Sequence, residues 1–273
     1  MSDIEQTSRP ELILDDVNDI NMDDFAEGVD TNRLPATSDL TGQELTFAFT
    51  DGGSLKLALG DGVAHWTAAG AAWSGAGEGD FEEVRLDDGV YWLDFTIAER
   101  QSETVTVTLA PQRGWALVVH SVVHPEDFHT ETRVTQTFYP ARIAGAPQPS
   151  TLPVPTLELI GKRSIFQYSP NHLYEHVYFN SRRFVWHNLI GAAPGVAQVE
   201  LATTYKLDDH LYLFTWRENP IPVATVFVFD YGNARSTGKF IGVTRDGAVS
   251  NTPGGAIITE FGKSDYSEFI AVS

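Results

Sequence analysis

The stretch LIGKRSIFQYSPNHLYEHVYFNSRRFVWHNLIG, residues 159–191, decides the fold, because it joins strand-like alternation to a clear turn signal at Ser169-Pro170-Asn171. Successive side chains of a strand point to opposite faces, so every second residue of 172–179 shares a face. An ordinary solvent face would carry Lys, Glu, Thr or Ser. One face here carries only tyrosine and histidine: His172, Tyr174, His176 and Tyr178. This face predicts either the wall of a polar, aromatic cavity or a buried hydrogen-bonded cluster.

Neighbouring runs supply matching faces. The first carries Arg182, Phe184, Trp186 and Asn188, and the second carries Tyr212, Phe214, Trp216 and Glu218. Aromatic side chains on adjacent strands often fill a core. If Arg182 and Glu218 point inward, they pair with each other or bind a substrate. Because both lie near strand ends, an exposed position is the alternative.

The same alternation extends outward to residue 40, with turns such as Asp51-Gly52-Gly53 between runs. The pattern of the first half also recurs in the second half. LDDGVY (86–91) corresponds to LDDHLY (207–212) at an offset of 121 residues. No long amphipathic helix is evident. These patterns predict an all-β chain of two similar units, each the size of a small closed antiparallel barrel that encloses room for one ligand.

Composition changes divide the chain further. Residues 1–36 form an acidic arm, for which a mobile leader and a strap packing Phe25 and Leu34 across a barrel mouth are alternatives. Residues 37–144 form the first barrel and 157–273 the second. Between them, residues 145–156 hold four prolines and no charge, which indicates an extended linker.

Charge restricts the partners. The net charge is −19, and nearly all of it falls in residues 1–150. Such a surface repels nucleic acids and anionic membranes, so neither is expected as a partner. The chain has no cysteine, no apolar run long enough to cross a membrane and no secretory signal, so we expect a cytoplasmic protein.

Several segments resemble the MoaF family. YSPNHLYEHVYFNSRRFVWHNLIG (168–191), LDDHLYLFTWRENPIP (207–222) and RSTGKFIG (235–242) are similar to its C-terminal half, and FAEGVDTNRLP (25–35), GAGEG (75–79) and LDDGVYWLDF (86–95) to its N-terminal half. The resemblance covers nearly the whole chain and implies two lipocalin-like (calycin) barrels in tandem. The family label, molybdenum cofactor biosynthesis, has no support in these residues.

A more distant similarity is to phenolic acid decarboxylases, which are single lipocalin-like barrels with Tyr, Arg and Glu in one cavity. The corresponding inventory here is Tyr168, Tyr174, Tyr178, Arg182 and Glu218.

The predicted function is an enzyme that needs no cofactor and no metal, of lyase, decarboxylase or isomerase type, acting on a small aromatic or unsaturated carboxylic or carbonyl compound. Tyrosine can stabilise an oxyanion, and His or Glu can move a proton. The candidate catalytic residues are Tyr174, His176, Tyr178, Arg182 and Glu218. The candidate substrate-binding residues are Tyr168, His172, Trp186, Tyr212, Phe214 and Trp216.

Two alternatives remain from the sequence: a non-catalytic protein that binds a small molecule, and a solidly packed second barrel that serves assembly, with a homo-oligomer possible. The first barrel lacks the tyrosine and histidine wall, so we expect it to be structural.

Overall fold

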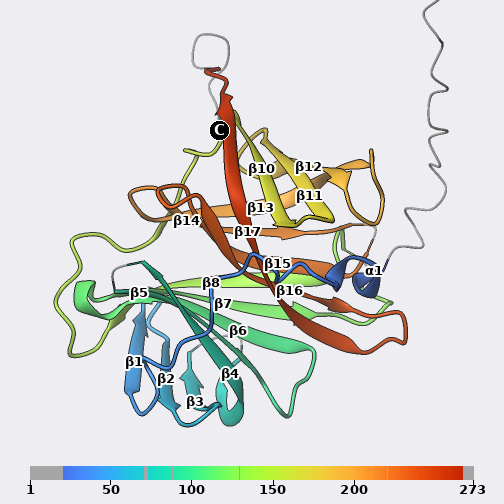
Figure 1. The fold of residues 1–273 in the computed structure, drawn as a ribbon. Helices are drawn as coiled ribbons and strands as arrows, with labels where there is room; N and C mark the ends of the chain where they lie inside the picture. Colours follow the sequence, from blue (N-terminus) through green and yellow to red (C-terminus); the bar gives the residue numbers. More distant parts are fainter. Residues whose placement is uncertain (1–20, 71–72, 88, 129, 220, 267–273) are drawn as a thin grey trace, which may run out of the picture.

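The computed structural model describes residues 21–70, 73–87, 89–128, 130–219 and 221–266. The prediction of an all-β chain with two antiparallel barrels in tandem is confirmed (Figure 1). The first barrel is a closed meander in which each strand pairs with the next and the last pairs with the first. Its strands are β1 (Glu44–Phe49), β2 (Ser54–Leu59), β3 (Val63–Ala69), β4 (Gly75–Asp87), β5 (Val90–Thr96), β6 (Glu103–Ala110), β7 (Trp115–Val123) and β8 (Val134–Ile143), with a 3-10 turn η2 (Pro111–Arg113) before β7.

The second barrel repeats this topology. Its strands are β10 (Lys162–Ser169), β11 (His172–Tyr178), β12 (Arg183–Ile190), β13 (Ala197–Asp208), β14 (Leu211–Arg217), β15 (Val223–Asp230), β16 (Arg235–Val243) and β17 (Val249–Lys263). β10 pairs with β17, and β12 pairs with β13. The predicted turn at 169–171 joins β10 to β11.

The repeated motif occupies the same hairpin in both barrels. LDDGVY joins β4 to β5, and LDDHLY joins β13 to β14, each with a register shift just before the turn. Gly89 and its counterpart His210 both adopt a positive φ, of 70° and 61°. The left-handed region suits glycine, so His210 accepts a backbone conformation that the turn imposes.

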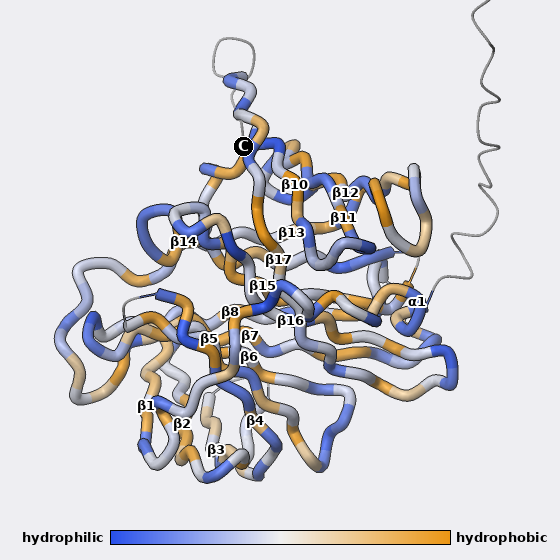
Figure 2. Tube along the Cα trace, viewed as in Figure 1, coloured by the Kyte–Doolittle hydropathy of each residue, from blue (hydrophilic) through white to orange (hydrophobic). Residues whose placement is uncertain are grey.

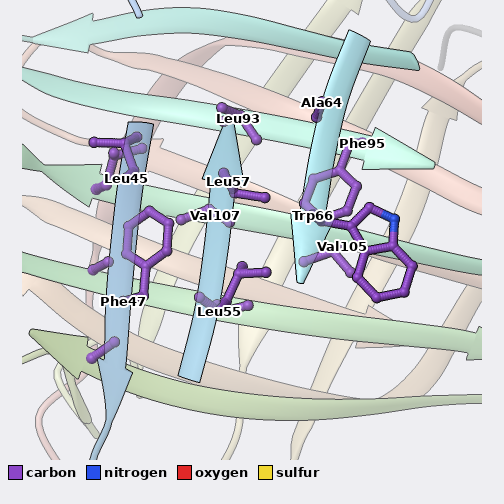
Figure 3. Packing of buried hydrophobic residues seen from close by; sticks show 14 of the residues in the cluster. Leu45, Phe47, Leu55, Leu57, Ala64, Trp66, Leu93, Phe95, Val105 and Val107 are labelled. Carbon is purple, nitrogen blue, oxygen red and sulfur yellow. The ribbon is translucent and has the colours of Figure 1, made fainter. Parts of the chain in front are cut away.

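The interior of the first barrel is filled. Large apolar side chains from facing strands pack at its centre, including Phe47, Leu57, Trp66 and Phe95, each at most 3% exposed (Figure 3). Every second residue of each strand points inward. Most of these positions are apolar, but Glu83, opposite Leu93, and His120, opposite Val105, are buried polar exceptions. Hydrophobic residues follow the strands of both barrels, whereas many outer turns are hydrophilic (Figure 2).

The barrels contact each other through the outer faces of their strands. Trp92 and Leu117 of the first barrel belong to one apolar cluster with Leu213 and Val226 of the second. Lys239 of β16 crosses this contact, forms an ion pair with Asp94 and donates to Thr104 Oγ1 at 2.6 Å. Both charged side chains are at most 5% exposed.

The described part of the arm is a strap on the second barrel. Helix α1 (Met22–Ala26) buries Met22 and Phe25, and the Phe25 ring lies 5.3 Å from that of Phe240. Asn32 N donates to Tyr168 O at 3.1 Å. The predicted packing of Leu34 at the barrel mouth is wrong, because Leu34 packs on the cluster between the barrels. Residues 1–20 lie outside the described part.

Part of the proline-rich segment is paired with the second barrel. Its β9 (Val154–Pro155) adds to β13 beside Tyr205 and Lys206. The linker is therefore held along the second barrel.

Candidate functional site

The second barrel encloses a cavity of about 60 Å³ under the strap. Its lining residues come from the strap, from six strands and from two turns: Phe25, Val29, Tyr168, Tyr174, His176, Trp186, Asn188, Ala192, Ala193, Gln198, Trp216, Glu218, Ile221 and Phe240. A volume of this size holds a few water molecules or a small organic group.

The alternation of β11 places Tyr174 and His176 on the cavity wall. The other two residues of this β11 face, His172 and Tyr178, do not line the cavity. His172 is at the strand end, where its Nδ1 lies 2.9 Å from Ser169 Oγ. Tyr178 is buried beyond the cavity, with its hydroxyl 3.3 Å from His176 Nδ1 and 3.5 Å from Tyr231 OH. The face therefore runs through the barrel and only its middle reaches the cavity.

His176 is surrounded by aromatic rings. Its centroid lies 4.2 Å from that of Phe166, 5.1 Å from Phe184 and 5.6 Å from Trp216. Burial lowers the pKa of His176 to about 3, because an apolar environment disfavours the imidazolium. The imidazole is thus neutral near neutral pH, which does not suit the expected role of His176 as a proton carrier.

Three polar atoms of the cavity residues are buried without a hydrogen-bond partner among the described residues: Tyr168 OH, Trp186 Nε1 and Asn188 Oδ1. Tyr168 and Asn188 are each 2% exposed. Asn188 Nδ2, by contrast, lies 3.5 Å from the Tyr174 hydroxyl oxygen. An unsatisfied buried polar atom costs about 1–3 kcal/mol, so three of them around one cavity require a physical explanation.

Glu218 projects from the end of β14 into the cavity wall and is 8% exposed. It accepts a hydrogen bond from Trp216 Nε1 at 3.1 Å. Burial raises the pKa of Glu218 to about 7. Glu200 on β13 is 1% exposed, and burial together with the charge of Glu218 raises its pKa to about 8. Two interacting carboxyl groups therefore share the interior without both being ionised at neutral pH.

Arg182 is not part of this site. It is exposed in the turn before β12, where its N donates to Asn180 Oδ1 at 2.9 Å. The strand begins one residue later, so the inward alternation starts at Phe184 and does not extend back to Arg182. The structure shows the exposed alternative for Arg182, and no Lys or Arg is among the cavity residues named above.

Two further predicted residues lie away from the cavity. Tyr212 OH donates to Glu158 Oε2 at 2.7 Å. Phe214 packs with Tyr178 and Phe184 at centroid distances of 5.2 and 5.0 Å. Tyr168, Tyr174, His176, Trp186, Trp216 and Glu218 are the predicted residues that the structure brings together.

Sequence reasoning missed Glu200 and Gln198. They precede the inward Ala202 at alternate positions of β13, so the strand period was the available signal. Charged residues are rarely fully buried, and a sequence of this kind is typical of a solvent face.

Within the described residues, no helix is long and apolar enough to cross a membrane.

Comparison with known proteins agrees with the architecture. The MoaF N-terminal domain profile matches residues 19–125, and the MoaF C-terminal domain profile matches residues 153–264. Protein MoaF of Klebsiella aerogenes is 30% identical over 237 residues, covering 82% of this chain and 87% of that protein. A Burkholderia vietnamiensis structure described as a candidate beta-lactamase is 12% identical, covers 37% of this chain and 94% of its own, and has a TM-score of 0.31, which supports no inference. The two domain matches and the relative together show that the chain belongs to the MoaF family.

Proposed function

We propose that this protein binds a small molecule in the cavity of the second barrel. The supporting observation is the group of three buried, unpartnered polar atoms, Tyr168 OH, Trp186 Nε1 and Asn188 Oδ1, around an otherwise aromatic cavity. Ligand sites are typically apolar concavities with a few fixed polar groups. In the first barrel, Trp66 Nε1 and Trp73 Nε1 are also buried without a partner among the described residues, but both residues belong to its packed core and not to the wall of this cavity.

The experiment uses Tyr168→Phe, which removes one unpartnered hydroxyl and keeps the ring. Without ligand, the variant should be more stable than the wild-type protein by about 1 kcal/mol, because the cost of the unsatisfied group disappears. Urea unfolding measures this difference. Tyr139→Phe serves as the matched control in the first barrel.

The same variants are then titrated with small aromatic compounds while tryptophan fluorescence is followed, because Trp186 and Trp216 line the cavity. We expect saturable quenching that is weaker in Tyr168→Phe and unchanged in Tyr139→Phe. A destabilised Tyr168→Phe variant with unchanged binding would contradict the proposal.

Catalysis is the second candidate function, and Glu218 is the observation that favours it. A carboxyl group with a pKa of about 7 inside an apolar cavity suits general acid–base chemistry. The Tyr174 hydroxyl could then stabilise charge on a carbonyl oxygen. Since no cation lines the cavity, a neutral carbonyl compound fits better than a carboxylate or a phosphorylated pterin.

Glu218→Gln separates the two functions. Gln keeps an acceptor for Trp216 Nε1 but cannot transfer a proton. An enzyme should lose turnover by about 100-fold or more with little change in affinity. A binding protein should show no conversion of any compound by NMR in either form.

A further inference from the structure

We propose that the ligand of the second barrel is a small organic cation, whose ammonium group lies between the aromatic rings and Glu218. This inference rests on the proposed function, because it names the chemical class that the same cavity accepts. The reasons are the rings, the carboxyl groups and the unpartnered acceptors of the cavity wall.

The rings form a cage around the cavity. Tyr174 meets Trp186 edge to face at 6.1 Å, and Tyr168 meets Tyr174 in the same way at 6.0 Å. Phe240 lies 5.8 Å from Trp216 and 5.3 Å from Phe25, and all three residues line the cavity. The electron-rich faces of such rings attract cations, and tryptophan and tyrosine do so most strongly.

The carboxyl groups make the cavity favourable for positive charge. Glu218 lines it, and Glu200 lies close enough to Glu218 for their charges to interact. Glu218 forms no ion pair among the described residues, and its side chain accepts a hydrogen bond from the neutral Trp216 indole. A buried carboxylate without a cation is costly, so a cationic ligand would supply the missing counter-charge.

Two unpartnered buried atoms add acceptors for an ammonium N–H. Asn188 Oδ1 is a pure acceptor, and the Tyr168 hydroxyl oxygen can accept as well as donate. Both residues line the cavity and are 2% exposed. An anionic ligand would be repelled by an ionised Glu218, and a neutral ligand would supply no charge to favour the ionised form of Glu218.

Cation binding should release a proton near neutral pH, because a positive charge beside Glu218 favours its ionised form. The titratable groups that face Glu218 come from three other strands: Tyr168 on β10, Tyr174 and His176 on β11, and Glu200 on β13. The two tyrosines have raised pKa values through burial, and His176 stays neutral. Arg183, which interacts with Glu200, forms an ion pair with Glu131. The two glutamates are therefore the groups that titrate.

The test compares three probes with the same ring and different charge: benzylamine, benzyl alcohol and benzoate. Calorimetry and tryptophan fluorescence measure their affinities for the full chain at about pH 7.5. We expect benzylamine to bind at least about tenfold more tightly than benzyl alcohol, and benzoate more weakly than either. Affinity for benzylamine should rise from about pH 6 to pH 8, with proton release to the buffer below pH 7.

Glu218→Gln should reduce the preference for benzylamine over benzyl alcohol to within about twofold, because the amide lacks the charge that distinguishes the two probes. Asp209→Asn is the matched control, since Asp209 has a side chain 88% exposed and the same charge is removed outside the cavity. It should leave the preference unchanged.

Equal binding of amine and alcohol by the wild-type protein would overturn the cation inference and leave the proposed function standing. An unchanged preference in Glu218→Gln would also overturn it. If none of the probes alters the fluorescence of Trp186 and Trp216, the cation inference fails, and the stability of Tyr168→Phe decides the proposed function separately.

Discussion

At the scale of single residues, the interior of the second barrel is defined by polar groups whose charge is suppressed. Near neutral pH His176 stays neutral because it is buried among rings, and Glu218 and Glu200 hold protons because burial raises the pKa of each. All three shifts disfavour the ionised form, so they contribute to a pH dependence of stability.

Raised carboxyl pKa values make the folded state bind more protons than the unfolded chain between about pH 4.5 and pH 8. The free energy of unfolding should therefore fall as the pH rises through this window. His176 acts in the opposite direction, because its lowered pKa adds stability as the pH rises from about 3 to 6.5. The carboxyl and histidine effects overlap in pH. The pH dependence of the wild-type free energy of unfolding therefore does not separate them.

The difference between Glu218→Gln and the wild-type protein does separate them. The variant should match the wild type in stability at about pH 4.5 and become progressively more stable than it up to about pH 8, because Gln stays neutral. Urea unfolding at a series of pH values measures this. A difference that is constant with pH would show that Glu218 titrates normally.

At the scale of elements, the strap is the part of the molecule that covers the cavity. Phe25 contributes a ring to the lining, and Arg245 holds α1 through Asp24 at 2.8 Å and through its N, which donates to Asp23 Oδ2 at 2.8 Å. The strap thus combines a buried anchor with an exposed ion pair.

Phe25→Ala should open the cavity and lower the free energy of unfolding by about 3 kcal/mol, as for other large aromatic truncations. Stopped-flow tryptophan fluorescence with benzylamine should show faster association and still faster dissociation. Arg245→Gln is the control, because it removes an exposed ion pair worth at most about 1 kcal/mol and leaves the lining intact. Equal dissociation rates in wild type and Phe25→Ala would show that the strap does not retain the ligand.

Strand alternation and the recurrence of LDDGVY as LDDHLY were enough to predict the two barrels, because period-two patterning and turn chemistry are local properties of the chain. The same alternation grouped Trp186 with Asn188, and Trp216 with Glu218, on shared faces, and all four residues line the cavity.

The sequence-based predictions of site residues failed in two situations. One is the end of a strand, and the other is a position where tertiary packing buries a residue type that is usually exposed. Arg182 precedes the first residue of β12, so its side chain does not follow the alternation of inward and outward positions in that strand. Glu200 is buried although charged residues rarely are, and its environment depends on Glu218 from the next strand. Such pairings between strands are tertiary, so one sequence does not reveal them.

At the scale of the whole molecule, the contact between the barrels contains a buried ion pair. Asp94 accepts from Thr106 Oγ1 at 2.6 Å and from Asn251 Nδ2 at 2.7 Å, and it pairs with Lys239 from the other barrel. Burial lowers the pKa of Lys239, and Asp94 opposes this shift. Both charges depend on the barrels remaining docked.

Lys239→Met should destabilise the protein by about 3–5 kcal/mol, because it leaves Asp94 buried without its cation. Adding Asp94→Asn should recover part of this loss, since the amide carries no charge. Thermal unfolding of the two single variants and the double variant gives the coupling between the sites. Additive losses would indicate that the two side chains do not interact across the contact.

The filled first barrel and the hollow second barrel also differ in what sequence change each can absorb. A substitution among Phe47, Leu57 and Trp66 disturbs a packed interior, whereas one at the cavity wall alters the shape and polarity of an existing space. The wall of the hollow barrel should therefore be the part of the molecule that evolution can vary at the lower cost in stability, because the filled barrel keeps its own packing when that wall changes.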